Sequence, residues 1–119
     1  MKYAIICLLI LTFVLVYGCA TQPSTKTPGP STGNLGIKQD VEIKGFAFSP
    51  ASVTVPVGAT VIWTNSDSAT HTIISDSGSE ISSGSVAKGQ TYAHTFNTQG
   101  TYAYHCGIHP SMKGTVIVQ

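Results

Sequence analysis

Residues 100–114 of this 119-residue chain read GTYAYHCGIHPSMKG, and no other stretch predicts as much of the structure. Its first part alternates tyrosines with small or polar residues, which predicts a β-strand with Tyr102, Tyr104 and Cys106 on one face. Aromatic residues at alternate positions are typical of a side that faces a core. We therefore expect the Cys106 thiol to point into the domain and the His105 ring to point away from it.

The loop after this strand concentrates three metal-binding side chains. Cys106, His109 and Met112 stand three residues apart. A thiolate, an imidazole and a thioether together select copper over hard cations, and one Cys with two imidazoles and a long bond to Met is typical of type 1 (blue) copper sites. Zinc is the alternative metal, but it prefers further thiolates or carboxylates and makes no use of Met. The sequence therefore predicts one copper ion, with a second imidazole from elsewhere.

Three further histidines are candidates for that second imidazole. The parity of the strand excludes His105. Across a four-residue hairpin loop expected at 97–100, His94 falls two or three residues from Cys106, roughly 7–10 Å at about 3.4 Å per residue. Metal–imidazole bonds are about 2 Å long, so we expect His94 to be a packing residue. His71 remains, because it follows a turn-rich stretch and begins a strand.

Short apolar runs separated by Gly, Pro, Asn and Ser fill the sequence from Ile37 onward. They recur about every ten residues without sustained helical periodicity, which predicts an all-β antiparallel sandwich. One strand is expected over 41–48. The predicted core consists of Phe46, Val53, Val55, Val61, Trp63, Ile73, Phe96, Tyr102, Tyr104, Val116 and Val118.

Residues 37–119 resemble the small cupredoxins of the plastocyanin and amicyanin type. The segment VIWTN at 61–65, which leads to His71 and Thr72, is similar to the region of the first copper ligand in that family. Cys-x-x-His-x-x-Met resembles the shortest form of its ligand loop. The resemblance implies a Greek-key β-sandwich, copper binding and electron transfer. It also implies a ligand set of His71, Cys106, His109 and Met112.

Three residues are expected to support this site without binding the metal. Asn65 is expected to stabilise the loop of the first ligand by turn hydrogen bonds. The N–H groups of Thr72 and Ile108 are expected to donate to the Cys106 sulfur and so raise the reduction potential. The family's loops tend to have Pro in place of Ile108, and Pro has no N–H to donate.

The surface of the loop is expected to meet other proteins. Gly107, Ile108 and Pro110 would form an apolar docking patch around the edge of His109. A closed site has no open coordination position, so we expect an electron carrier rather than an enzyme. A copper-binding module for storage or delivery is the alternative function. We expect a monomer whose partners are redox proteins.

The amino terminus is expected to export and anchor the protein. An apolar stretch ends in Val-Tyr-Gly-Cys at 16–19, which resembles a bacterial lipobox. It predicts a lipoprotein signal peptide over 1–18, a lipidated Cys19 and a flexible Ser/Thr/Pro/Gly tether over 19–36. The domain would then lie at the cell envelope, outside the cytoplasm. An uncleaved membrane anchor is the alternative.

Cysteine and charge usage narrow the function further. Once Cys7 leaves with the signal and Cys19 is lipidated, Cys106 is the single thiol of the domain. A Cys19–Cys106 disulfide is the structural alternative. The chain has 6 basic and 5 acidic residues and no Arg. Without a basic stripe, nucleic acid is not expected as a partner.

Overall fold

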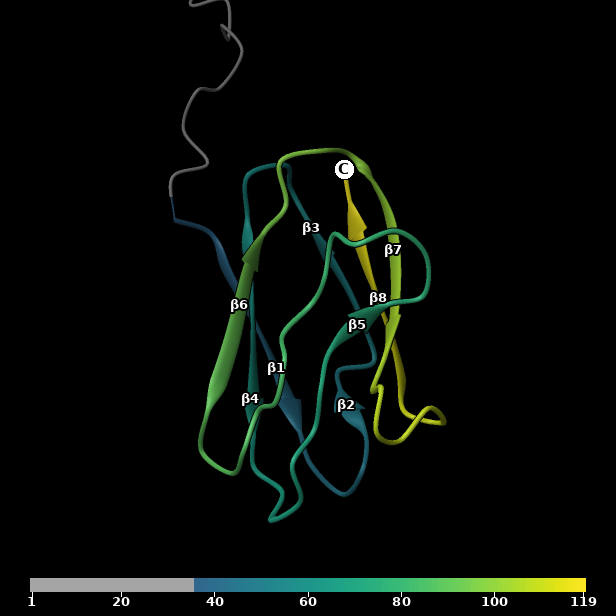
Figure 1. The fold of residues 1–119 in the computed structure, drawn as a ribbon. Helices are drawn as coiled ribbons and strands as arrows, with labels where there is room; N and C mark the ends of the chain where they lie inside the picture. Colours follow the sequence, from purple (N-terminus) through teal and green to yellow (C-terminus); the bar gives the residue numbers. More distant parts are fainter. Residues whose placement is uncertain (1–35) are drawn as a thin grey trace, which may run out of the picture. The chain divides into compact units, whose positions relative to one another are not determined.

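The computed structural model describes residues 36–119, and the predicted signal peptide, lipidated Cys19 and tether lie outside the described residues, apart from position 36. The described residues form eight β-strands in two sheets of four strands each, packed face to face (Figure 1). No helix occurs between residues 36 and 119, and hence none that could cross a bilayer. The predicted all-β sandwich is confirmed.

Each sheet combines strands that are distant in the sequence. The first sheet has the order β2-β1-β4-β6, with bounds Phe48–Ser49, Lys38–Ile43, Thr60–Asn65 and Thr91–Thr95. The second has the order β3-β8-β7-β5, with bounds Ser52–Val55, Lys113–Val118, Gly100–His105 and Ile74–Ser75. Strand β1 is parallel to β4, and β3 is parallel to β8. The sheets are therefore mixed rather than purely antiparallel.

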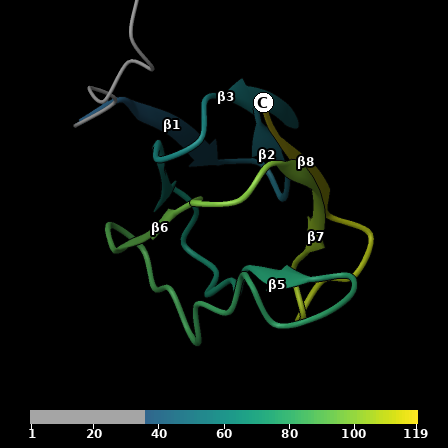
Figure 2. The ribbon, with the colours of Figure 1, turned by 90° about the horizontal axis from the view of Figure 1, so that it is seen from above.

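The connection between β6 and β7 differs from the prediction. β6 pairs with β4 in the first sheet, whereas β7 pairs with β5 and β8 in the second. The segment between them crosses from one sheet to the other, as the view from above shows (Figure 2). The hairpin expected at 97–100 is therefore wrong. A short polar connection fits either arrangement, and the pairing partners of each strand decide between them.

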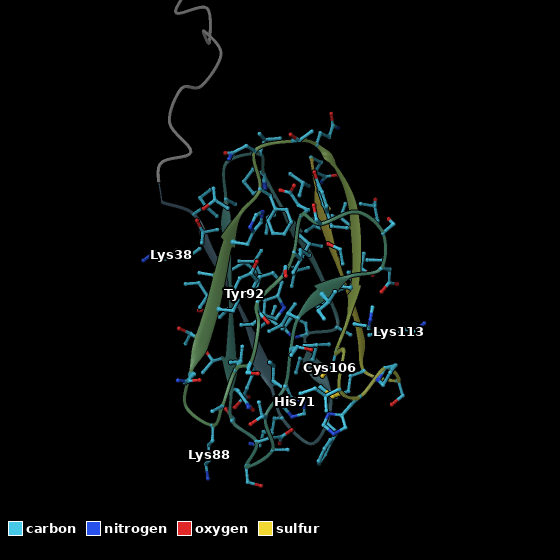
Figure 3. The ribbon with its side chains drawn as sticks, in the orientation of Figure 1. Lys38, His71, Lys88, Tyr92, Cys106 and Lys113 are labelled. Atoms are coloured by element: carbon cyan, nitrogen blue, oxygen red, sulfur yellow. The ribbon has the colours of Figure 1, made fainter. Side chains whose placement is uncertain are left out.

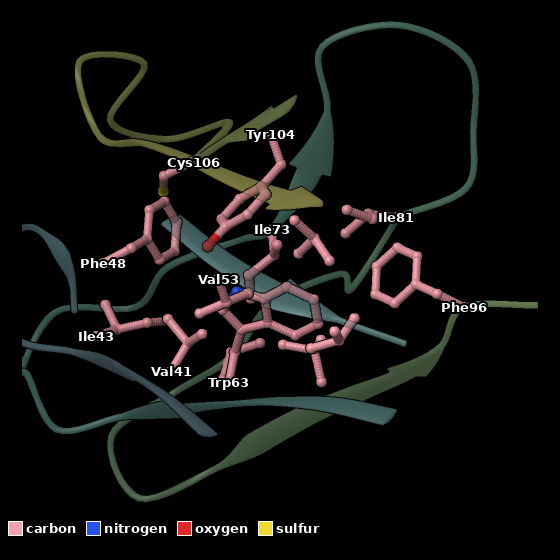
Figure 4. Close-up of a cluster of buried hydrophobic side chains, with 14 of the residues drawn as sticks. Val41, Ile43, Phe48, Val53, Trp63, Ile73, Ile81, Phe96, Tyr104 and Cys106 are labelled. Atoms are coloured by element: carbon pink, nitrogen blue, oxygen red, sulfur yellow. The ribbon is translucent and has the colours of Figure 1, made fainter. Parts of the chain in front are cut away.

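The core lies between the sheets and is built from alternate strand residues. Nine of the eleven predicted core residues are buried, and Tyr102 is partly buried against them. Trp63 and Tyr104 pack edge to face at its centre, with ring centroids 5.4 Å apart (Figure 4). Cys106 is buried in the core, as its predicted inward direction requires. The core also contains residues that were not expected there: Val41, Ile43, Phe48, Ala59, Ile81, Val86 and Met112.

Phe46 is the core prediction that is wrong, since its side chain is 54% exposed. The expected strand over 41–48 is interrupted by a tight turn, in which Lys44 and Ala47 exchange N–H···O=C bonds of 3.0 and 3.2 Å. Gly45 and Phe46 occupy the turn with φ of 61° and 58°. Both angles are left-handed, as in type I′ hairpin turns. The turn separates β1 from β2 and carries Phe46 out of the core.

Candidate metal centre

Three loops meet at the end of the sandwich that lies away from the C-terminus, the lower end in Figure 1. They are the β1–β2 turn, the segment between β4 and β5, and the loop between β7 and β8. The second of them carries His71 and the third begins with Cys106, and these residues lie close together (Figure 3). The carboxylate of Asp67, in the second loop, accepts hydrogen bonds from the N–H groups of Gly45 and Phe46 and so joins the second loop to the first.

The structure brings three of the predicted ligands into one cluster. Cys106 Sγ lies 3.7 Å from His71 Nδ1 and 3.8 Å from His109 Nδ1. The three donor atoms all lie within 4.8 Å of one another. A trigonal metal with bonds of about 2.0 Å to nitrogen and about 2.3 Å to sulfur would separate its nitrogen and sulfur ligands by about 3.7 Å. The side chains are thus spaced for an ion between them.

Met112, the fourth predicted ligand, is buried in the hydrophobic core, as Cys106 is. The loop closes by two backbone hydrogen bonds. Met112 N–H donates to the His109 carbonyl at 2.9 Å, and Cys106 N–H donates to the Met112 carbonyl at 3.0 Å. This tight turn brings the backbone of residue 112 back beside that of residue 106, and both side chains are buried.

The other two histidines lie outside the cluster. His105 points outward from β7, as predicted, and its Nδ1 lies 2.6 Å from an oxygen of Asp76. His94 stands opposite Val61 of β4 rather than opposite β7, so the predicted reason for excluding it was wrong. Its ring is partly buried and lies 2.8 Å from an oxygen of Glu80. The two histidines therefore pair with carboxylates at the surface.

The surroundings of Cys106 favour its thiolate. Burial opposes ionisation, but the N–H groups of Thr72 and His109 and the rings of His71 and His109 outweigh it. Together they lower the pKa of the thiol from 9.0 to about 6. The N–H of Thr72 lies 3.4 Å from the sulfur, as predicted. A thiolate is the form that binds metal, so the site is prepared for a cation.

After the Thr72 N–H, the second backbone group that lowers the pKa of the thiol is the N–H of His109 and not that of Ile108. Among the described residues, no hydrogen bond to the sulfur involves the Ile108 N–H, and this prediction needs correction. The Ile108 side chain is 51% exposed and lies on the outer surface.

Family membership follows from comparison with known proteins. The family described as the cupredoxin-like domain matches residues 6–118. The chain belongs to the cupredoxin family. A plastocyanin from Scenedesmus fuscus is 35% identical over 96 residues, which cover 70% of this chain and 97% of that protein. Amicyanin-alpha from Methylorubrum extorquens is 34% identical over 84 residues, which cover 67% of this chain and 71% of the relative.

Solved cupredoxin structures share the fold. Amicyanin from Paracoccus versutus matches with a TM-score of 0.64 and 35% identity, over 69% of this chain and 81% of amicyanin. A copper-containing nitrite reductase from Thermus scotoductus matches with a TM-score of 0.64 and 32% identity, over 70% of this chain and 22% of the reductase. This cupredoxin thus corresponds to a small part of that enzyme.

The donor atoms fit the cofactor of the family. One thiolate and two imidazoles in a trigonal cluster, with a thioether nearby, form the set that type 1 copper prefers. The cofactor of this cupredoxin is therefore one type 1 copper ion. Type 1 sites are electron-transfer sites, which makes the chain a blue copper protein of the single-electron-transfer kind.

Asn65 lies under the loop that carries His71. Its side chain is fully buried. The amide nitrogen donates to the carbonyls of Ala69 and Val86, at 2.7 and 2.9 Å, and the amide oxygen accepts the N–H of Asp67 at 2.8 Å. One side chain thus binds two backbone groups of the loop and joins the loop to Val86 in the segment between β5 and β6. This agrees with the structural role predicted for Asn65.

Two residues at the site were not predicted to contribute to it. Asp67 Oδ2 lies 3.0 Å from His71 Nε2. The Phe46 N–H, and then those of Gly45 and the His71 ring, hold the pKa of Asp67 below 3.8 although burial opposes this. The carboxylate therefore accepts hydrogen bonds at neutral pH. Phe46 is the second residue, and its ring lies against both His71 and His109.

Proposed function

We propose that this cupredoxin is a membrane-tethered carrier of single electrons between redox proteins outside the cytoplasm. In this proposal His71 Nδ1, His109 Nδ1, Cys106 Sγ and the Met112 thioether would hold the copper. The observation that carries it is the spacing of the three donor atoms, which suits a trigonal metal. Bound copper supplies the one-electron couple.

A carrier of this kind needs ligands that move little when the oxidation state changes. The Cys106 and His71 side chains are fully buried. The backbone of His71 exchanges hydrogen bonds with Val86, with N–H to carbonyl distances of 3.1 and 2.8 Å. Held in this way, the ligands keep one geometry for both oxidation states, which favours fast electron transfer over ligand exchange.

The proposed route for the electron passes through the exposed side of the site. His109 is partly exposed, and Gly107, Ile108 and Pro110 are exposed around it. Gly107 is fixed by its N–H, which donates to Thr72 Oγ1 at 2.7 Å. These residues form the proposed docking patch, and a redox partner seated on it would stand close to the His109 ring.

We infer that the domain has no catalysis of its own. Within residues 36–119, one group of His, Cys, Asp or Glu side chains is close enough to hold a metal, and it is the cluster described above. A copper with four protein ligands leaves no position for a substrate. The relation to nitrite reductase concerns a domain of that enzyme.

The tether and the location rest on the sequence of the amino terminus. Signal peptide 1–18, lipidated Cys19 and linker 19–36 would place the copper domain at the cell envelope, held to the membrane by lipid. Cys19→Ala tests this part by itself. The variant should lose incorporation of labelled fatty acid and leave the membrane fraction, while the copper domain keeps its spectrum. A variant that stays in the membrane fraction without lipid would favour the uncleaved anchor.

The experiment that tests the carrier function is a titration of the metal-free domain with Cu(II). An intense visible charge-transfer band and an EPR spectrum with a small parallel hyperfine splitting are expected. Electron self-exchange should then be fast. Colourless binding of Cu(I), with ready loss to a chelator, would instead support copper storage or delivery.

A further inference from the structure

Phe46 has an unusual position and an unusual backbone conformation. Its φ of 58° is one that aromatic residues rarely adopt. Its ring centroid lies 5.5 Å from that of His71 and 5.0 Å from that of His109, nearly perpendicular to both, with interplanar angles of 79° and 87°. The two imidazoles are themselves 5.0 Å apart. Phe46 thus covers the pair of imidazole ligands from the solvent side.

Such a conformation persists only where surrounding groups impose it, and Asp67 supplies them. One carboxylate oxygen accepts the N–H of Gly45 at 2.7 Å, and the other accepts the N–H of Phe46 at 2.9 Å. Both amides of the left-handed turn therefore bind one side chain. That side chain is 12% exposed, so water competes little for these hydrogen bonds.

The same carboxylate also holds the first ligand. Asp67 Oδ2 lies 3.0 Å from His71 Nε2. Because the ionised carboxylate can only accept, Nε2 carries the proton. The Nδ1 lone pair is then free for the metal, which is the usual effect of a carboxylate behind a metal-binding histidine. Asp67 therefore joins Phe46 and His71, which are 25 positions apart in the chain.

The other imidazole–carboxylate pairs show that this arrangement is not a general surface feature. The side chains of His94 and Glu80 are 26% and 44% exposed, and those of His105 and Asp76 are 29% and 39% exposed. His71 is 0% exposed. Of the three carboxylates, Asp67 alone among the described residues also accepts backbone N–H groups from a second loop.

We propose that Asp67 and Phe46 act as one positioning unit that retains the copper. The carboxylate fixes the Gly45–Phe46 turn and the His71 ring together, so that Phe46 covers both imidazole ligands. Copper can leave only when an imidazole swings away or a competing ligand reaches the metal. The Phe46 ring hinders both. This inference rests on the proposed function, because it takes His71 and His109 to be copper ligands.

Copper release tests the unit directly. The copper(I) form of the full domain is mixed with excess bicinchoninate, and the rate of copper transfer is followed. Phe46→Ala and Asp67→Ala should each accelerate release, with a loss of copper affinity of roughly 10- to 100-fold. The double variant should release copper no faster than the faster single variant, because both changes disable one unit. Glu80→Ala is the matched control and should not change the rate.

A second measurement needs no metal. In the metal-free protein, amide hydrogen exchange at Gly45 and Phe46 should be faster in Asp67→Ala than in the wild type, and unchanged in Glu80→Ala. Equal exchange at these amides would refute the carboxylate's part in the unit. If Asp67→Ala does not fold, the exposed Phe46→Ala variant decides the covering role by itself.

The outcomes separate this proposal from the one on which it rests. A wild-type protein without a type 1 spectrum would refute the proposed function and, with it, the retention of copper. A blue Phe46→Ala variant that releases copper at the wild-type rate would overturn the positioning unit alone. The proposal would also be overturned if the increases in copper release caused by Phe46→Ala and Asp67→Ala multiplied in the double variant. The two residues would then act independently and not as one unit.

Discussion

The two imidazoles of the copper site are held in different ways. His71 is fully buried, its backbone is hydrogen-bonded to Val86, and its ring is hydrogen-bonded to Asp67. The buried Asn65 side chain also donates to the Val86 carbonyl. The His109 side is a short exposed loop closed by one turn, with Ile108 51% exposed beside it. The difference suggests a division of tasks. Under the proposed function, the buried half would fix the geometry of the ligands and the exposed half would meet the redox partner.

Cys106 belongs to both halves, and its replacement should have the largest effect. Cys106→Ser removes the thiolate whose charge transfer gives a type 1 site its colour. We expect complete loss of the visible band after addition of Cu(II), with an unchanged circular dichroism spectrum of the metal-free fold. Ser111→Ala, in the exposed part of the same loop, is the control and should remain blue. If the Cys106→Ser protein were still blue, the Cys106 thiolate could not be a ligand of the copper.

Replacement of Asn65 should destabilise the buried half. Asn65→Ala leaves the carbonyl of Ala69 and the N–H of Asp67 without their partner. The Val86 carbonyl loses one of its two donors and keeps the N–H of His71. Since an unsatisfied buried group costs about 1–3 kcal/mol, we expect a loss of about 2–4 kcal/mol in the free energy of unfolding. Urea denaturation of the metal-free protein measures it. The exposed Asn97→Ala should change the value by less than about 0.5 kcal/mol; an equally small effect of Asn65→Ala would show that the loop supports itself.

Sequence reasoning found candidate ligands in both halves, but it missed the long-range contacts that hold the buried half. The spacing of Cys106, His109 and Met112 and the parity of β7 describe a local segment, so they could be interpreted without the fold. Asp67 contacts a turn 21 and 22 residues earlier, and no local pattern reveals that contact. The alternation over 41–48 likewise predicted a strand. It could not show that Gly45 and Phe46 would be left-handed, because a carboxylate from another loop stabilises that turn.

The stability of the metal-free protein should depend on pH through the ionisation of the Cys106 thiol. The folded thiol has a pKa of about 6 instead of 9.0. Between these values the unfolded chain binds one more proton than the folded one, so stability rises with pH. The contribution is fully present above the unfolded pKa and is lost as the pH falls through about 6.

Thiolate absorbance in the ultraviolet should therefore appear near pH 6 in the metal-free protein. Unfolding free energies of wild type and Cys106→Ser, compared across this pH range, isolate the sulfur from the histidines. A difference between the two proteins that does not grow with pH would contradict the role of the surrounding N–H groups and imidazoles.

A positive charge added to the exposed half should slow electron self-exchange without changing the colour of the copper site. Ile108→Lys places like charges between the docking patches of two copies that meet at His109. We expect electron self-exchange to slow by roughly tenfold, because a charge at an interface acts mainly on association. Line broadening in NMR spectra of mixed oxidation states measures the rate. Ile37→Lys is the control, since this residue is 45% exposed near the start of β1. Equal rates in the two variants would place the docking surface elsewhere.

The smallest effect is expected for Ile108→Pro. Pro removes the N–H that the sequence alone suggested as a donor to the sulfur, and loss of such a donor would lower the reduction potential. In the structure, the backbone N–H groups that stabilise the Cys106 thiolate are those of Thr72 and His109. The Ile108→Pro substitution removes neither of them. The potential, measured by voltammetry, should therefore stay at the wild-type value. A clear fall would mean that the Ile108 amide turns toward the sulfur once copper is bound, and the exposed half would then tune the metal as well as present it.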